Sequence, residues 1–143
     1  MKSEGISRFL DAQNQVYLKA LSEIKSGRKT THWMWYIFPQ IKGLGSSETA
    51  NFYAIKDINE AEEYLKHPVL GKNLVEISKA VLAINDKSAQ EIFGSPDDMK
   101  LHSSMTLFGV VVNGDPVFGQ VLYKYFDGFL DKRTMDLLKG RIK

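Results

Sequence analysis

Residues 95–112 read Ser-Pro-Asp-Asp-Met-Lys-Leu-His-Ser-Ser-Met-Thr-Leu-Phe-Gly-Val-Val-Val, and we expect this segment to lie at the centre of the molecule. A capping serine, a proline at the first helical position and two acids in the first turn are typical of a helix N-terminus. Beyond Lys100 the segment is apolar on nearly every side, which predicts a buried central helix. The run from Val110 to Val112, taken alone, would also suit a strand.

Amphipathic helices are predicted on both sides of this segment. Apolar residues recur with the 3.6-residue period before Gly27 and again after the turn at residues 113–116. The two stripes consist of Ile6, Phe9, Leu10, Val16, Tyr17, Ala20, Leu21 and Ile24, and of Val117, Phe118, Val121, Leu122, Tyr125, Phe126 and Phe129. Capping boxes that begin at Asp57 and Ser88 open further helices, and no alternating run indicates a strand. We therefore predict an all-α protein, a compact single-domain multihelical bundle of about seven to eight helices over residues 1–143.

The bulk composition restricts the class of protein. With 143 residues, of which 43% are apolar and 25% charged, the chain fits one soluble globular domain. No apolar run approaches the ~20 residues of a membrane helix, and the N-terminus has no hydrophobic signal core, so we expect a cytoplasmic protein without a membrane partner. The absence of cysteine from this sequence excludes disulfides, thiol catalysis and thiolate zinc sites.

Residues 27–47 form the most unusual part of the chain. Four of the six residues 33–38, which we call the aromatic block, are aromatic, and both tryptophans are among them. Arg28 and Lys29 come shortly before the block, and a Gly-Leu-Gly-Ser-Ser turn begins at Gly43. Cations, aromatic rings and a glycine turn are therefore within reach of one another on a short piece of backbone.

The aromatic block has two interpretations, and both can hold at once. One is a hydrophobic core in which the indole N–H groups find backbone acceptors. The other is a cleft in which Trp33 or Trp35 stacks on a planar ligand such as a nucleobase or nicotinamide. On a helix, Trp33 and Tyr36 would lie near one face, with Trp35 and Phe38 further round.

The residues at the edges of the block suggest an anion site. Arg28 and Lys29 either complement the dipole of the preceding helix or form an anion clamp. The turn at Gly43 leads into a helix whose free N–H groups would favour an anion, and we include Gln40 and Ser46 among the candidate ligand contacts. The turn is neither a Walker motif nor a dinucleotide fingerprint, because the spacing and the preceding strand are both absent.

Two further groups of residues are candidates for chemistry. His32 is either a hydrogen-bonded structural residue or a general acid or base. On the central helix, Lys100, Ser103 and Ser104 share a face, which favours ligand binding or helix packing over covalent catalysis. Asp98 either stabilises the helix N-terminus or acts as a general base. Three scattered histidines without a carboxylate at metal spacing predict no metal site, and no cofactor is expected.

Taken together, strings throughout the chain resemble a family of small bacterial and fungal proteins, the domain of unknown function 1810. The most specific string is His-Trp-Met-Trp-Tyr-Ile-Phe-Pro-Gln at residues 32–40. The other matching strings are Arg8-Phe9, Ala12-Gln13, Tyr17, Gly27-Arg28-Lys29, Gly43-Leu44-Gly45, Tyr53-Ala54-Ile55, His67-Pro68-Val69-Leu70-Gly71, Ile92-Phe93-Gly94, Pro96-Asp97-Asp98, Lys100-Leu101 and Ser103-Ser104-Met105-Thr106-Leu107-Phe108. The resemblance implies one predominantly helical domain without an established activity. The label calpastatin that some members carry does not fit, because a calpain inhibitor is disordered whereas this sequence predicts capped helices around a core.

The function expected from these residues is binding of a small anionic ligand with a planar ring, such as a nucleotide or an NAD-related metabolite. The pocket would lie between the aromatic block and the central helix, where the basic pair holds the anion and a tryptophan stacks. If chemistry follows, hydrolysis or group transfer with His32 or Asp98 as general base needs no cofactor. The alternative is a non-enzymatic interaction module that uses an exposed aromatic patch. Nucleic-acid binding is disfavoured, because too few charges follow Lys29 to form a continuous basic groove.

Overall fold

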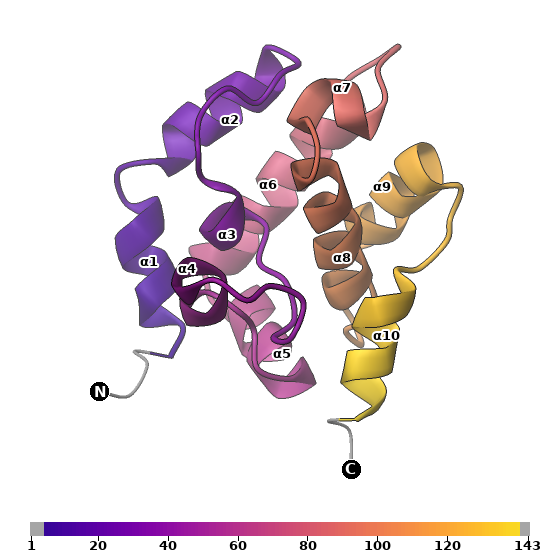
Figure 1. Cartoon of the computed structure of the whole chain (residues 1–143). Coiled ribbons are helices and arrows are strands. Elements are labelled where there is room, and N and C mark those ends of the chain that lie inside the picture. The colour runs from indigo at the N-terminus through magenta and orange to yellow at the C-terminus, as the bar shows by residue number, and fades with distance from the viewer. Residues whose placement is uncertain (1–4, 141–143) are drawn as a thin grey trace.

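The computed structural model describes residues 5–140, which form ten helices and no β-strand (Figure 1). The helices are α1 (Ser7–Gln13), α2 (Tyr17–Lys25), α3 (Met34–Ile37), α4 (Glu48–Phe52), α5 (Ile58–Lys66), α6 (Leu70–Ala83), α7 (Ala89–Phe93), α8 (Asp97–Gly109), α9 (Val117–Phe126) and α10 (Lys132–Lys139). The valine run at residues 110–112 lies in a turn after α8 rather than in a strand. None of the helices within residues 5–140 is long and apolar enough to cross a bilayer. The predicted all-α class is confirmed.

The number of helices within residues 5–140 exceeds the predicted seven to eight. The first predicted helix is interrupted at residues 14–16, so that α1 and α2 are separate helices. Phe9 on α1 and Ala20 and Ile24 on α2 are buried in the same core, so the apolar period continues across the break and does not reveal it. The aromatic block adds a further short helix, α3, of four residues.

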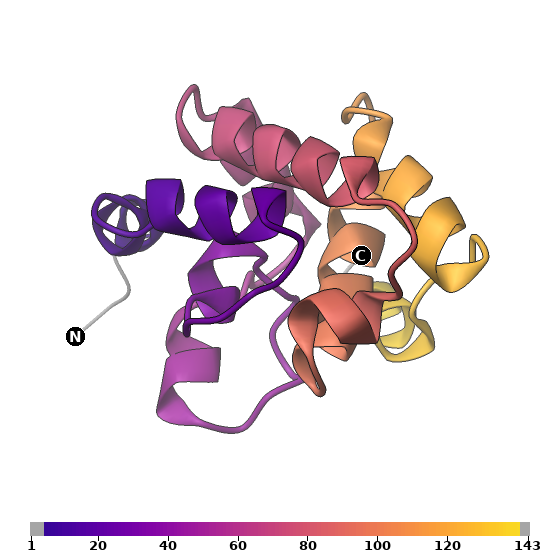
Figure 2. The ribbon, with the colours of Figure 1, turned by 90° about the horizontal axis from the view of Figure 1, so that it is seen from above.

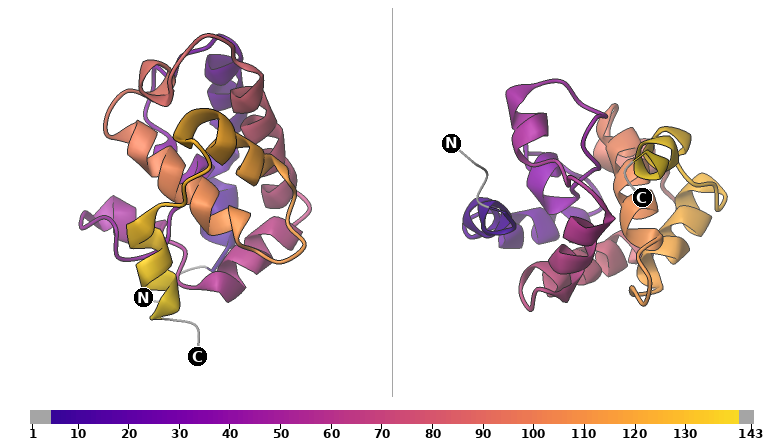
Figure 3. Two further views of the ribbon diagram at one scale, coloured as in Figure 1. Left: turned by 90° about the vertical axis from the view of Figure 1, so that its right-hand side faces the viewer. Right: turned by 90° about the horizontal axis from the view of Figure 1, so that it is seen from below.

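Helix α8 lies at the centre of the bundle, as predicted. Every residue from Leu101 to Phe108 except His102 is buried. Helix α8 packs against α5, α7, α9 and α10 (Figure 1). Seen from above, α6 lies alongside α2 (Figure 2), and the side view in Figure 3 shows α9 and α10 next to α8. The core is therefore arranged around α8, with the N-terminal helices on one side and the C-terminal helices on the other.

The N-terminus of α8 differs in detail from the prediction. The helix begins at Asp97 with Pro96 at the N-cap position, and no side chain caps it, so the prediction of Ser95 as the cap is wrong. The N–H of Asp98 instead donates to the carbonyl of Gly94 at 2.9 Å. A main-chain acceptor therefore takes the place of the serine hydroxyl.

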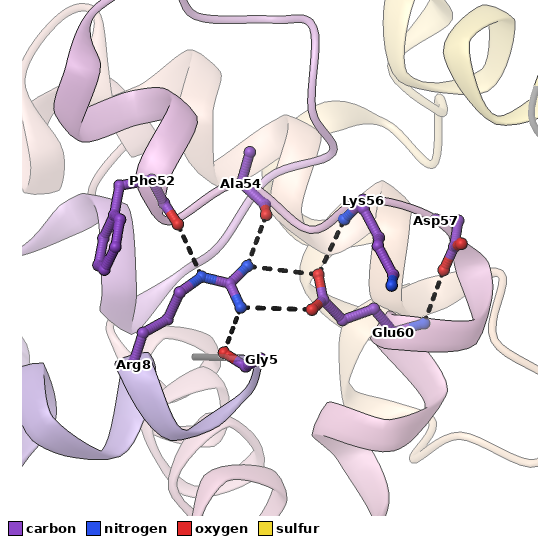
Figure 4. A network of polar contacts seen from close by, with 7 residues as sticks. All are labelled: Gly5, Arg8, Phe52, Ala54, Lys56, Asp57 and Glu60. Carbon is purple, nitrogen blue, oxygen red and sulfur yellow. Dashed lines mark hydrogen bonds and ion pairs between the residues drawn. The ribbon is translucent and has the colours of Figure 1, made fainter. Parts of the chain in front are cut away.

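A buried ion pair fastens the chain between α4 and α5 to α1 (Figure 4). Arg8 on α1 lies 3.3 Å from Glu60 on α5, with side chains that are 3% and 6% exposed. The guanidinium also donates to the main-chain carbonyls of Gly5, Phe52 and Ala54. Arg8 therefore joins three separate parts of the chain through one planar group.

Gly71 permits a very close approach of α6 to the end of α5. A Cβ atom at this position would lie 2.0 Å from the main-chain oxygen of Leu65. Gly71→Ala is therefore expected to push the helices apart and to lower the free energy of unfolding by about 1–3 kcal/mol. Urea unfolding followed by circular dichroism measures this loss. The control is Gly119→Ala, whose added Cβ would meet no heavy atom within 4 Å, and equal stability of the two variants would contradict the close approach.

Candidate functional site

Glu23 organises the loop that leads from α2 into the aromatic block. The loop follows Gly27, whose φ of +88° belongs to the left-handed region that favours glycine. Oε1 of Glu23 accepts hydrogen bonds from the main-chain N–H groups of Thr30 at 2.8 Å and Thr31 at 3.0 Å. The same oxygen accepts from Nε1 of Trp33 at 2.9 Å, and the Thr31 hydroxyl donates to Oε2. One carboxylate therefore fixes both the loop backbone and the orientation of the Trp33 ring.

The environment of Glu23 favours its ionised form. The residue is only 8% exposed, and burial alone raises the pKa of its carboxyl group. The hydrogen bonds from Thr31, Thr30 and Trp33 act in the opposite direction and together lower the pKa from 4.5 to about 2. The group is therefore a carboxylate at neutral pH, and four hydrogen-bond donors compensate its charge.

The aromatic block is divided between core and surface. Trp33 and Phe38 are buried with ring centroids 6.2 Å apart, whereas Trp35 and Tyr36 are partly exposed. The predicted pairing of Trp33 with Tyr36 on one face is therefore wrong. Trp33 and Phe38 flank a helix of only four residues and have non-helical backbone angles, so helical spacing does not relate them. Of the two tryptophans, Trp35 is the one that is open to solvent.

Two lysines, two tryptophans and one carboxylate converge where the aromatic block meets α8. We call Lys29, Trp33, Trp35, Asp97 and Lys100 the lysine–tryptophan cluster. Nζ of Lys29 lies 2.8 Å from Oδ2 of Asp97 and 5.0 Å from the centre of the Trp33 ring. Nζ of Lys100 lies 3.4 Å from Oδ1 of Asp97 and 5.1 Å from the centre of the Trp35 ring. Each ammonium group therefore contacts one carboxylate oxygen and one aromatic face.

The lysine–tryptophan cluster has a buried half and an open half. The side chain of Lys29 is 7% exposed, whereas those of Asp97 and Lys100 are 20% and 26% exposed. Lys29 is also held through its main-chain N–H, which donates to the carbonyl of Ile92 at 2.8 Å. A molecule approaching from solvent would therefore meet Asp97, Lys100 and Trp35 before it met Lys29.

The polar residues of α8 point in different directions. Lys100 and Ser104 are four residues apart and share one face of the helix. The hydroxyl of Ser103 instead lies 3.1 Å from the carbonyl oxygen of Met99 in the preceding turn and 3.3 Å from Oδ2 of Asp131, next to the start of α10. Asp98 precedes Lys100 by two residues and so lies about 200° round the helix from it. The structure therefore joins Ser104 to the Lys100 face and directs Ser103 and Asp98 elsewhere.

Two buried oxygen atoms on α8 have no hydrogen-bond partner among the described residues, Oδ1 of Asp98 and Oγ of Ser104. Such atoms are rare, because a buried polar group without a partner costs about 1–3 kcal/mol. Ser104 is fully buried behind Lys100, while Asp98 is partly exposed. Both atoms retain the capacity to accept a hydrogen bond.

Arg28 and His32 lie on the solvent side of the loop. Both residues are exposed, and within residues 5–140 no hydrogen bond or ion pair engages either side chain. The main chain of Arg28 is nevertheless fixed, because its N–H donates to the carbonyl of Glu23 at 3.1 Å. The guanidinium of Arg28 is therefore available to an anion. No three His, Asp or Glu side chains of the described part of the chain lie close enough together to hold a metal ion.

The glycine turn after the aromatic block is closely packed. Trp35, Gln40, Gly43 and Gly45 line a hollow of about 10 Å³, which is room for about one water molecule. A Cβ atom at Gly45 would lie 2.7 Å from the Cβ of Ala50 on α4, so the turn rests directly on that helix. The turn therefore brings Gln40 next to Trp35 without opening a cradle for a larger anion.

Ser46 lies outside this hollow. It is exposed and lines a different hollow with Phe52 and Tyr53. The next residue, Ser47, caps α4 by accepting a hydrogen bond from the N–H of Ala50 at 3.0 Å. The candidate contacts Gln40 and Ser46 therefore belong to separate hollows, which meet at Tyr53.

Of the two residues that assemble the site, Glu23 is not predicted to take part, and Asp97 is interpreted only as an acid of the first turn of the central helix. Glu23 lies between Leu21 and Ile24 in the apolar stripe of α2, where an acid on a buried face signals an internal hydrogen-bond network. Asp97 fits the general preference for acids in the first turn of a helix. Because this local role explains an acid at this position, the sequence gives no reason to expect its contact with Lys29.

Comparison with known proteins agrees with the resemblance found in the sequence. The model of a family described as "protein of unknown function (DUF1810)" matches residues 3–138. The crystal structure of the conserved hypothetical protein Rv1873 from Mycobacterium tuberculosis is similar over 94% of this chain and 96% of that chain, with 46% sequence identity and a TM-score of 0.92. No curated protein matches the chain. The chain therefore belongs to the DUF1810 family.

Proposed function

We propose that the lysine–tryptophan cluster binds a small anionic ligand with a planar ring, such as a nucleotide or an NAD-related metabolite. The observation that carries this proposal is the convergence of Lys29 and Lys100 on Asp97, with each ammonium group over a tryptophan ring. Two cations that share one carboxylate leave an excess of positive charge at this point. The N-terminus of the thirteen-residue helix α8 adds a favourable dipole.

The anionic group of the ligand would bind at the open half of the cluster. Lys100 is accessible there, and Arg28, which precedes Lys29 in the sequence, has an exposed and unengaged guanidinium that we propose as a second anion contact. Because Asp97 already binds both lysines, a phosphate or carboxylate of the ligand would have to approach beside this carboxylate or replace it. Asp97 therefore acts as an internal competitor of the ligand anion.

The planar ring of the ligand would stack on Trp35. This ring is partly exposed, and the ammonium group of Lys100 lies over it at 5.1 Å from the ring centre. Stacking of a base on an aromatic side chain is worth about 1–3 kcal/mol when measured by truncation. Trp33 is fully buried and would contribute only by holding Lys29.

Isothermal titration calorimetry with ADP-ribose, NAD⁺ and AMP tests this proposal. We expect at least one of them to bind and Lys100→Ala to weaken that binding about tenfold, because a charge-assisted contact is lost. Trp35→Leu is expected to weaken it by about 5- to 150-fold, which corresponds to the loss of stacking.

The matched control is Lys19→Ala, which removes an exposed lysine of α2 that makes no ion pair within the described residues. This variant should bind with the wild-type dissociation constant. If none of the three ligands binds, or if all three variants bind like the wild type, the proposal is wrong.

Catalysis would be a step beyond binding. A hydrolase or group-transfer enzyme of this kind would use His32 or Asp98 as general base and need no cofactor. His32 is exposed and Asp98 points away from the Lys100 face, so the geometry favours binding more than catalysis. Chromatography of NAD⁺ after incubation with the protein decides the question. Conversion that is lost in His32→Ala or Asp98→Asn would support an enzyme, and unchanged NAD⁺ would contradict it.

An interaction module is the second candidate, because a group of apolar side chains is exposed around the end of α9. Tyr123 and Phe129 are 78% and 70% exposed, and Leu130 is exposed as well. A Cβ atom at Gly128 would lie 3.9 Å from the Tyr123 ring, so the segment packs beside that ring. Sedimentation velocity tests whether this patch associates. Association that is lost in Phe129→Ser would support the candidate, and a monomer at all concentrations would count against self-association.

A further inference from the structure

A groove of about 740 Å³ lies between the end of α5, the first turns of α6 and residues 111–115. Its volume falls within the range of about 300–1,000 Å³ that is usual for ligand pockets. Gly71 brings α6 against the end of α5, because a Cβ atom there would lie 2.0 Å from the main-chain oxygen of Leu65. At Gly114 an added Cβ atom would lie in ordinary contact with the Leu65 side chain, 3.7 Å from its Cδ1. The groove is therefore a consequence of close packing around Leu65, and it is separate from the lysine–tryptophan cluster.

The lining of the groove includes an apolar strip. Leu65 and Val75 are partly buried, and Val111 is almost fully buried. Val112, at the edge, is 74% exposed. Apolar surface that faces water beside a concave wall is typical of a site that takes an apolar group.

The charges along α6 are arranged so that two lysines have no acidic partner. Lys72, Glu76 and Lys79 all line the groove, and Glu76 is within helical reach of both lysines. The carboxylate of Glu76, however, accepts a hydrogen bond from the hydroxyl of Tyr17 on α2, with an O–O distance of 2.6 Å. Lys72 and Lys79 make no ion pair within residues 5–140, and they lie about 10 Å apart along the helix axis.

The groove is lined in all by three acids and three lysines. Glu62 and Lys66 are four residues apart on α5, so their opposite charges offset each other. Neither residue makes an ion pair within the described residues. Asp115 is engaged, because its Oδ1 accepts a hydrogen bond from the N–H of Val117 at 2.9 Å. The hydrogen bonds to Glu76 and Asp115 come from neutral donors and leave both carboxylates charged, so the lining as a whole is neutral. Within residues 5–140, however, no lysine of the lining forms an ion pair, so each ammonium group can bind an added anion directly.

We propose that this groove binds an amphipathic anion. The apolar body of the ligand covers Val75 and Val112, and its carboxylate or phosphate binds the ammonium group of Lys72 or of Lys79, which lie on either side of Glu76. The apolar strip supplies contact area, while the two lysines select a negatively charged head group. This proposal does not depend on the function proposed for the lysine–tryptophan cluster.

Calorimetric titration of the full chain with octanoate, octyl phosphate, octan-1-ol and inorganic phosphate tests the proposal, with each amphiphile kept below its micelle concentration. The first two probes should bind, and octan-1-ol should bind at least about tenfold more weakly because it lacks the charge. Inorganic phosphate should also bind at least about tenfold more weakly, because it leaves the apolar strip uncovered. Equal affinity of octan-1-ol and octanoate, or equal affinity of inorganic phosphate and octyl phosphate, overturns the proposal.

The variant Lys72→Ala/Lys79→Ala identifies the site. It should weaken the binding of octanoate and of octyl phosphate about tenfold or more. Its melting temperature should stay near that of the wild type, since both lysines are exposed. The matched control is Lys19→Ala/Lys25→Ala, which removes two exposed lysines of α2 outside the groove and should leave both dissociation constants unchanged. Equal weakening by the two double variants, or weakening by neither, overturns the proposal.

Discussion

Replacing Glu23 with alanine is expected to lower the free energy of unfolding by about 3 kcal/mol. The substitution removes the acceptor of three N–H groups, those of Thr30, Thr31 and the Trp33 indole. Because Trp33 is fully buried, its indole N–H loses its acceptor in the interior of the protein. The loop that carries Lys29 loses its anchor at the same time, so the effect reaches the candidate site. Chemical denaturation followed by circular dichroism measures the loss.

Glu23→Gln separates hydrogen bonding from charge. The amide oxygen of glutamine can accept the three hydrogen bonds that reach Oε1, and its nitrogen can donate to the Thr31 hydroxyl, which donates to Oε2 in the wild type. At pH 7 this variant should therefore lose less stability than Glu23→Ala. An alanine variant that is as stable as the wild type would contradict the role assigned to this carboxylate.

The difference in stability between the wild type and Glu23→Gln should also depend on pH. The pKa of Glu23 in the folded protein is about 2, below its ordinary value of 4.5. A group with a lowered folded pKa stabilises the protein fully above the unfolded pKa, and this contribution disappears as the pH falls from 4.5 towards 2. A shift of this size corresponds to about 3 kcal/mol. Urea unfolding at pH 7 and pH 3 should therefore show a smaller difference at pH 3, and a constant difference would be the contrary result.

Arg8→Leu is expected to lower the free energy of unfolding by about 3–5 kcal/mol, the largest effect that we predict. The variant leaves the buried carboxylate of Glu60 without its cation and the carbonyls of Phe52 and Ala54 without their donor (Figure 4). An uncompensated buried charge is more costly than the loss of the ion pair itself. Unfolding with guanidinium chloride as the denaturant measures this loss of stability.

The double variant Arg8→Leu/Glu60→Leu tests whether the pair acts as a unit. Because it removes both charges, its loss of stability should be smaller than the sum of the two single losses. Arg133→Ala, which truncates an exposed arginine of α10, is the control and should change stability by less than about 0.5 kcal/mol. Additive single losses, or an Arg8→Leu variant as stable as the control, would show that the buried pair does not hold α1 to α5.

The parts of the fold that follow from local rules could be predicted from the sequence. Ser88 and Asp57 cap their helices by accepting from the third following N–H, as predicted, but only Ser88 with Glu91 forms the full capping box. The side chain of Glu60 accepts from the N–H of Lys56 and pairs with Arg8 instead of returning to Asp57. The buried character of α8 follows from its apolar circumference. The break between α1 and α2 does not follow, because both helices bury the same face and the apolar pattern is insensitive to a change of axis.

The candidate site could be predicted only in pieces, for a related reason. The basic pair and the rings are neighbours in sequence, so their proximity is visible, whereas the contact of Lys29 with Asp97 joins α8 to a distant loop. Ser103 shows the opposite case, since its helical spacing to Lys100 is correct but its hydroxyl lies against the carbonyl of Met99 and the carboxylate of Asp131. Local spacing fixes the directions of side chains on one helix and leaves their partners to the tertiary fold.

The most direct test of the lysine–tryptophan cluster compares Asp97→Asn with Lys100→Ala in calorimetric titrations with ADP-ribose. If the two lysines hold the anion of a ligand and Asp97 competes with it, removal of the negative charge should tighten binding, while removal of Lys100 weakens it. Opposite changes of the dissociation constant in the two variants are the result that we predict. Absence of binding to the wild type, or a dissociation constant that neither substitution alters, would contradict the assignment of a ligand site to this cluster.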